Sequence, residues 1–170
     1  MNNKTLEFLN ILPEVMDWSA CHPETKKDIK EGVMNSLGVF VKQEMERFNK
    51  LLKEVKKNLN SLVNAIKGTE VMSSKLEDIF NSFLNFKVPV SWMDNNIGFP
   101  SLKPLSSWVQ DLVDRIEFIG GWVSNGPPNT FWVAAFFFPQ GFMTATMQTY
   151  ARATGKPIDT LGFETHVLDI

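Results

Sequence analysis

Two stretches of this 170-residue sequence carry part of the glycine and lysine spacing of a nucleotide-binding loop. Such a loop needs the pattern G-x-x-x-x-G-K-[ST], because its backbone amides and its lysine must surround the phosphates. Gly121 and Gly126 have the first spacing, but Pro127 follows where lysine is required. The pair Gly155-Lys156 lacks both the upstream glycine and the following serine or threonine. We therefore expect no nucleotide site and no cofactor in this chain.

The titratable and nucleophilic side chains also lack a spacing typical of catalysis. His22 and His166 lie far apart in the sequence, so the simplest interpretation is two scattered surface residues. The single cysteine, Cys21, would need a positioned base to act as a nucleophile, and alone it forms neither a disulfide framework nor a cysteine-based zinc site. Four acidic residues are expected to be solvated or capping: Asp111, Asp114, Glu117 and Asp159. We expect no enzyme active site and no metal site here.

Composition and charge indicate an ordinary globular protein. Hydrophobic residues make up 44% of the chain and charged residues 21%, which argues against disorder. The net charge of −2 gives no electrostatic reason to bind nucleic acid or an anionic membrane. The longest apolar run, residues 131–138, is far shorter than the roughly 20 residues that cross a bilayer. A lone cysteine and an amino terminus without an apolar signal sequence favour a cytoplasmic protein.

The apolar pattern predicts a mainly α-helical fold, a bundle of about four to five helices that includes one long helix. Between about residues 36 and 67, apolar side chains recur every three or four positions, as on one face of a helix on the order of 45–50 Å long. The charged residues between them are assigned to the solvated face: Lys42, Glu44, Glu46, Lys50, Lys53, Glu54 and Lys57. Four lysines could contact an acidic partner and make the chain an independent protein-binding module, or could be only this solvated face: Lys50, Lys53, Lys56 and Lys57.

Shorter helices are expected on both sides of a proline-marked loop. Ser74 and Glu77 have the spacing of a capping box. Pro104 suits the first turn of a further helix, and Pro139 opens another that Gly155 ends. The beginning of the chain is weakly patterned. We therefore divide the chain into an amino-terminal segment, residues 1–35, and a helical region, residues 36–170.

Residues 161–168 change to an alternating pattern that predicts a β-strand. Leu161, Phe163, Thr165 and Val167 alternate with the residues between them. A lone strand would leave its backbone groups unpaired, so another strand is expected to pair with it. Because this sequence offers no second strand after it, we expect the chain to be a truncated piece of a longer protein.

Several blocks of the sequence closely resemble the C-terminal region of dynein heavy chains. The clearest are residues 88–92 (VPVSW), 99–105 (FPSLKPL), 107–112 (SWVQDL), 126–142 and 148–161. Residues 43–52 and 65–74 look similar to the same family. The resemblance covers about residues 36 to 168. The sequence resembles axonemal, inner-arm heavy chains more than cytoplasmic ones.

This resemblance implies a structural role without catalysis. In dynein heavy chains the stretch follows the sixth AAA+ module and forms the helical first part of the C-terminal domain, which packs on the AAA+ ring and continues into a β-rich part. The resemblance implies ATP, magnesium and microtubule contacts only in the full-length motor. It also implies partners in the rest of the heavy chain and in dynein complex subunits, and a place in the cytoskeleton, in the axoneme of a cilium or flagellum. Eight matching residues are interpreted as structural anchors: Trp92, Pro100, Pro104, Trp108, Arg115, Trp122, Trp132 and Pro139.

Overall fold

The computed structural model describes residues 2–30 and 33–167, and these form a mainly α-helical fold, as predicted. The regular elements are α1 (Asn2–Ile11), α2 (Pro23–Lys26), β1 (Asp28–Lys30), β2 (Val33–Met34), α3 (Ser36–Ile66), α4 (Ser74–Leu84), α5 (Leu105–Asn125) and α6 (Pro139–Thr154). Single 3-10 turns lie at η1 (Trp18–Ala20), η2 (Val90–Trp92), η3 (Val133–Ala135) and η4 (Ile158–Thr160). Strands β1 and β2 form a short antiparallel hairpin. No helix of the described ranges is both long and apolar enough to cross a membrane.

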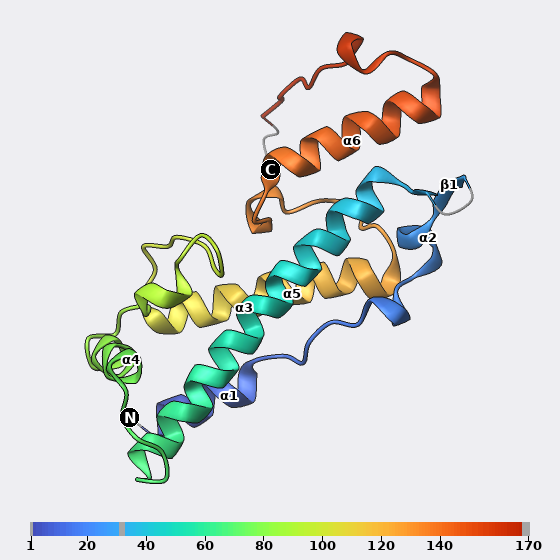
Figure 1. Cartoon of the computed structure of the whole chain (residues 1–170). Helices are drawn as coiled ribbons and strands as arrows, with labels where there is room; N and C mark the ends of the chain where they lie inside the picture. The colour runs from blue at the N-terminus through green and yellow to red at the C-terminus, as the bar shows by residue number, and fades with distance from the viewer. Residues whose placement is uncertain (1, 31–32, 168–170) are drawn as a thin grey trace.

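The long helix α3 is the element on which the other helices pack. It spans 31 residues, as the apolar spacing predicted, and it contacts α1, α4, α5 and α6. Figure 1 shows α6 at its amino-terminal end, α5 crossing its middle, and α1 with α4 at its carboxyl-terminal end. Asn35 caps its start, where the side-chain oxygen accepts a hydrogen bond from the Gly38 amide at 2.7 Å.

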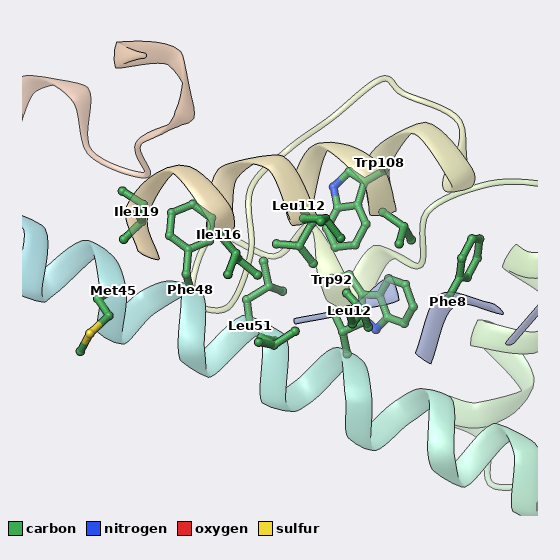
Figure 2. Packing of buried hydrophobic residues seen from close by; sticks show 14 of the residues in the cluster. Phe8, Leu12, Met45, Phe48, Leu51, Trp92, Trp108, Leu112, Ile116 and Ile119 are labelled. Atoms are coloured by element: carbon green, nitrogen blue, oxygen red, sulfur yellow. The ribbon is translucent and has the colours of Figure 1, made fainter. Parts of the chain in front are cut away.

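Side chains that α3 and α5 turn toward each other form the middle of the core (Figure 2). Phe48 and Leu51 of α3 face Leu112, Ile116 and Ile119 of α5, and all five are almost completely buried. Each buried aliphatic or aromatic side chain contributes about 1.5–3 kcal/mol to folding. This interface therefore fixes how α5 lies on α3.

The amino-terminal residues are built into the same core. Phe8 and Leu12 of α1 are buried, and Phe8 meets the Phe83 ring of α4 edge to face at 5.9 Å. The Asn49 side-chain amide on α3 bonds both the N–H and the carbonyl of Met16, at 2.9 and 2.8 Å. Farther along, the Thr25 hydroxyl donates to the Trp122 carbonyl at the end of α5. These contacts tie the start of the chain to both long helices.

Two predicted helix starts differ by one residue from the observed ones. Ser73, rather than Ser74, caps α4, because its extended backbone lets the hydroxyl accept from the Leu76 amide at 3.3 Å. Pro104 is the capping residue of α5 and not its first helical residue. Pro139 is the first residue of α6 and Gly155 ends that helix with a φ of 67°, both as predicted.

Helix α4 ends in a left-handed turn that is occupied by Phe86. The Lys87 amide donates to the Ser82 carbonyl at 2.9 Å and the Phe86 amide to the Phe83 carbonyl at 3.2 Å. This is the pattern of a Schellman turn, whose left-handed position normally holds glycine. Phe86 has a φ of 55°, a strained conformation for a bulky residue. Its carbonyl accepts from the Leu105 amide, which links this turn to the start of α5.

The prediction of a terminal strand is wrong for residues 161–167, and Leu168 lies outside the described residues. They have no regular secondary structure, because no neighbouring strand in the described part supplies ladder hydrogen bonds. The chain instead returns along α6 after η4 (Figure 1). Leu161 and Phe163 line a hollow with Met147 and Tyr150 of α6. Part of the alternating pattern therefore reflects packing on a helix.

Candidate functional site

The segment that links α5 to α6, residues 131–138, is held by charged side chains from both long helices; we call it the connecting segment. It contains one 3-10 turn, η3, so it cannot satisfy most of its own backbone groups. Ala135 and Phe136 are buried, and buried backbone groups need partners within the protein. The apolar run is only partly buried, because Trp132 is 39% exposed and Phe138 53% exposed.

Arg115 of α5 holds the carbonyl groups of the connecting segment. Its Nη1 donates to the Ala134 and Ala135 carbonyl oxygens at 2.8 and 2.9 Å. Its Nε donates to Asp111 Oδ2, one helical turn earlier, at 2.8 Å. The guanidinium is thus oriented by the helix that carries it and binds two backbone oxygens of another segment.

Asp111 completes an ion-paired network at this site. Its other oxygen, Oδ1, accepts from Lys103 Nζ at 2.6 Å, and the residue itself is only 5% exposed. Burial raises the pKa of Asp111, but hydrogen bonds and positive charge from Lys103 and Arg115 outweigh burial and hold it below its usual value of 3.8. Asp111 is therefore ionised at neutral pH, and this charge stabilises the two cations beside it.

Glu44 of α3 holds the amide groups of the same segment. Its Oε2 accepts from the Phe137 amide at 2.7 Å and its Oε1 from the Phe138 amide at 3.1 Å. Burial is the largest influence and raises the pKa of Glu44 above its usual 4.5, although the two amides and the charge of Arg47 act in the opposite direction. We call Glu44, Lys103, Asp111 and Arg115 the clamp, because together they bind both kinds of backbone group.

Aromatic rings surround the clamp and extend from it through the core. The Arg115 guanidinium lies 4.5 Å from the centre of the Phe99 ring and 5.4 Å from that of Trp132. Phe99 stacks on Trp108, and Trp108 stacks on Trp92, each at 5.5 Å. Figure 2 shows Trp92 and Trp108 next to each other above α3. The clamp thus lies at one end of a column of stacked rings.

The buried indoles hold their places without hydrogen bonds. Within the described residues, the Nε1 atoms of Trp92, Trp108 and Trp122 are buried and have no partner. A buried donor left unpaired costs about 1–3 kcal/mol, so ring packing must more than offset that penalty. These tryptophans fill space, as the abundance of Phe and Trp over Tyr suggests.

The eight residues interpreted as anchors fall into two groups. Trp92, Trp108 and Trp122 are almost fully buried, and Arg115 is mostly buried. The other four are exposed to solvent: Pro100, Pro104, Trp132 and Pro139. The three prolines lie in or next to turns and helix starts, whereas Trp132 rests against Arg115 and Phe118.

Two members of the clamp contradict the sequence interpretation. The apolar pattern assigns Glu44 to the solvated face of α3, but it is 2% exposed; Asp111 is expected to be solvated or capping, but it is ion-paired within the core. A signal for each is present in the sequence. Glu44 lies four residues from both Phe40 and Phe48 on the buried side, and Asp111 lies four residues before Arg115.

The other candidate reactive residues, His22, His166 and Cys21, lie outside the clamp. His22 Nδ1 accepts from the Glu24 amide and caps α2, while His166 lies on the exposed carboxyl-terminal segment near Glu164. Cys21 is buried, and burial raises the pKa of its thiol, which keeps it protonated at neutral pH. Across residues 2–30 and 33–167, no three His, Cys, Asp or Glu side chains are grouped so that they could hold a metal.

The glycine pair with phosphate-loop spacing has the wrong conformation for such a loop. Gly121 lies inside α5, and Gly126 is the residue that ends this helix, with a φ of 94°. A phosphate loop instead needs its glycines ahead of a helix, where free amides face the phosphates. The charged side chains of the clamp bind backbone groups of the connecting segment. The role that this arrangement supports is structural.

Comparison with known proteins agrees with the resemblance of the sequence blocks. The family model for the C-terminal domain of the dynein heavy chain matches residues 1–170. Dynein axonemal heavy chain 6 of Homo sapiens is 47% identical over 142 residues, which cover 84% of this chain and 3% of that protein. Dynein axonemal heavy chain 12 of Mus musculus is 44% identical over 164 residues, 96% of this chain and 5% of that protein. The chain thus spans a small fraction of these relatives, and it belongs to the dynein heavy chain family, in which it matches the C-terminal domain.

Proposed function

We propose that this chain is an architectural part of an axonemal dynein heavy chain, a C-terminal domain that packs on the AAA+ ring of the motor without catalysis of its own. In this proposal ATP hydrolysis and microtubule binding belong to the rest of the heavy chain, in a cilium or flagellum. The family match supports the assignment to a heavy chain. One structural observation carries the packing role: an exposed apolar patch at the junction of α4 and α5.

The apolar patch consists of Leu84, Phe86 and Leu102. Their side chains are 54%, 75% and 106% exposed, although each is large and hydrophobic. The hydrogen bond between the Phe86 carbonyl and the Leu105 amide brings the end of α4 next to the start of α5. Leu102 lies three residues before Leu105, in the loop that leads into α5. Large apolar side chains exposed on such adjoining segments favour a surface that another protein covers.

The backbone at Phe86 supports the same interpretation. A left-handed conformation is unfavourable by about 1–2 kcal/mol for a residue with a side chain, and glycine would avoid this penalty. Within the described chain the Phe86 ring is mostly exposed, so its packing offsets little of that strain. Strained backbone conformations cluster at functional sites. We infer that the Phe86 ring contacts the rest of the heavy chain.

The patch borders a hollow that also reaches helix α1. Lys4 of α1 lines this hollow, about 200 Å³ in volume, together with Leu84, Phe86 and Leu105. A segment of the heavy chain that covers the patch would therefore find a recess beside it.

The proposal is tested by the association state of the chain and by its binding to the rest of a heavy chain. With the patch uncovered, the 170-residue chain is expected to self-associate with rising concentration in light scattering. The double variant Leu84→Ser, Leu102→Ser should reduce this association and weaken binding to a heavy chain that lacks this domain. The matched variant Val71→Ser, at an exposed apolar residue of the α3–α4 loop, should change neither.

Two results would contradict the proposal. The first is equal binding of the heavy chain by the wild-type chain and the patch variant. The second is ATP hydrolysis by the chain itself that a substitution within it abolishes, because that would show an active site.

A further inference from the structure

The solvent-facing side of α3 carries a row of cations that is not paired with carboxylates in the described part of the chain. This basic stripe consists of Arg47, Lys50, Lys53 and Lys57, all exposed. None of them forms an ion pair within residues 2–30 and 33–167, and Lys50 Nζ donates to the Asn96 carbonyl at 3.0 Å. At 1.5 Å per residue the stripe is about 15 Å long.

Lysines on either side of the stripe have acidic partners, so the stripe is a local feature. Lys56, which the sequence placed in the same run, pairs with Glu14 at 3.0 Å and does not belong to the stripe. Lys75 pairs with Glu54 at 2.6 Å, so this acidic residue next to the stripe already has a cationic partner. The chain as a whole has a net charge of −2, so a general excess of basic residues does not explain the stripe.

A hollow lined by charged and aromatic residues lies at the amino-terminal end of the basic stripe. Its volume is about 540 Å³, and its lining residues are Phe40, Gln43, Glu44, Glu46, Arg47, Lys50 and Phe138. The exposed Phe138 ring offers apolar surface to an incoming side chain. Both Glu44 oxygens accept backbone amides. Among the lining residues, Glu46 is the other carboxylate, and it makes no side-chain hydrogen bond to the described part of the chain.

We propose that the basic stripe and this hollow form a docking site for an acidic peptide segment that carries one bulky apolar side chain. The apolar side chain enters the hollow against Phe138, and carboxylates of the segment lie along Arg47, Lys50, Lys53 and Lys57. Exposed ion pairs are individually weak, so binding needs several of them together with the apolar contact. The site is separate from the apolar patch and does not depend on the proposed packing on the ring.

Charge and geometry favour a peptide over the other anionic partners. Domains that bind nucleic acid are usually strongly basic, whereas this chain has a pI of about 5.7. Helices that lie on membranes bury an apolar face in the lipid, but the apolar face of α3 is already covered by the core of the domain. A single row of cations beside a hollow that exposes the Phe138 ring fits an extended acidic chain with one apolar side chain.

Fluorescence anisotropy with three labelled peptides tests the proposal. The probe has six glutamates around one phenylalanine; in the second peptide serine replaces phenylalanine, and in the third glutamine replaces every glutamate. The 170-residue chain is expected to bind the first peptide more tightly than the other two. The affinity should fall as salt rises, because exposed charges are screened.

Charge reversal on the chain identifies the site. Lys53→Glu with Lys57→Glu should weaken binding of the first peptide by about tenfold or more. Lys87→Glu with Lys156→Glu changes the net charge equally at exposed lysines outside the stripe and should alter binding by less than about twofold. Phe138→Ser should remove the preference for the phenylalanine peptide while circular dichroism shows that the helices are retained.

Three outcomes would overturn the proposal. One is no measurable binding of the first peptide at low salt. Another is equal weakening by the stripe variant and by its charge-matched control, which would indicate a non-specific effect of net charge. The third is tighter binding of single-stranded RNA or of anionic vesicles through the same lysines, which would assign the stripe to a different class of partner.

Discussion

Two buried carboxylates hold the same connecting segment from opposite helices, in contrasting surroundings. Asp111 lies between Lys103 and Arg115 and acts on the segment through the arginine. Glu44 has no ion pair in the described structure and accepts two backbone amides directly. The comparison shows that one short segment can be fixed by an ion-paired carboxylate on one side and, on the other, by a carboxylate that is bonded to backbone amides without an ion pair in the described structure.

The two carboxylates should respond to pH in opposite directions. The pKa of Asp111 is lowered on folding, so its contribution to stability is complete above 3.8 and is lost as pH falls through the folded value. The pKa of Glu44 is raised, so the folded state holds its proton more tightly than the unfolded chain. Its contribution is complete below 4.5 and declines as pH rises through the folded value.

Removal of Arg115 should have the largest effect on the ion-paired side. Arg115→Met leaves Asp111 with the half-exposed Lys103 alone and leaves two carbonyls without their donor. Breaking a buried ion pair from one side costs about 3–5 kcal/mol, and we expect a loss of about 3 kcal/mol in urea unfolding at pH 7. Arg152→Met, at an exposed arginine, is the control and should change stability by less than about 0.5 kcal/mol. Equal effects of the two substitutions would show that the clamp does not stabilise the fold.

Neutralising Asp111 should have a smaller effect that depends on pH. Asp111→Asn keeps the shape of the side chain but removes its charge from beside two cations. We expect a loss of about 2 kcal/mol at pH 7, which shrinks below pH 3.8 because the wild-type carboxylate becomes protonated there as well. Asp114→Asn, on the exposed side of the same helix, should show neither effect in the same urea titrations. A loss for Asp111→Asn that stays constant from pH 7 to pH 3 would contradict the lowered pKa.

Neutralising Glu44 should have a still smaller effect with the opposite pH dependence. In Glu44→Gln one oxygen remains to accept an amide, while the loss of the second acceptor is partly offset because no charge is buried. We expect a loss of about 1 kcal/mol at pH 7 that grows as pH falls toward 4.5. Urea unfolding at pH 7, 6 and 5 measures this trend, with the exposed Glu46→Gln as control. If the Glu44 and Asp111 variants followed the same pH trend, the contrast between the two sites would be wrong.

Phe86 supplies a reference outside the clamp. Phe86→Gly relieves the left-handed strain and sacrifices little buried surface, so we expect a gain of about 0.5–1 kcal/mol. This gain should be the same at pH 4 and pH 7, because its cause is backbone strain and not charge. Thermal unfolding measures it, and Leu84→Gly, within the last turn of α4, should destabilise instead. A loss of stability for Phe86→Gly would mean that the ring is needed for folding.

Much of the helical framework follows from the sequence, because its signals are local. The apolar spacing of α3 and the proline and glycine that bound α6 predict both helices almost to the residue. Arg115 is predicted to be an anchor because it lies in a stretch that resembles dynein heavy chains. In the structure it binds two backbone carbonyls of the connecting segment. Whether the eight anchors act as such in a heavy chain stays a prediction.

The features that sequence reasoning misses depend on contacts between distant residues. Glu44 is interpreted as solvated because charged residues usually are, but the connecting segment, more than 90 residues later, covers it. Phe86 adopts a left-handed backbone conformation that a bulky side chain disfavours, and its carbonyl accepts a hydrogen bond from the Leu105 amide. The strand predicted at 161–167 is wrong for the same reason, since a strand depends on a distant partner. An alternating apolar pattern does not reveal whether another strand is present to pair with it.

The indoles of Trp92, Trp108 and Trp122, which have no hydrogen-bond partner within residues 2–30 and 33–167, make the core observable in solution. An indole that neither meets water nor donates a hydrogen bond emits fluorescence at short wavelength, and its N–H proton exchanges slowly with solvent. Trp132 is 39% exposed beside Arg115 and should be reached by a soluble quencher. The same protein thus has optical reporters of its interior and of its clamp. A change confined to the connecting segment should alter the quenchable signal before the protected one.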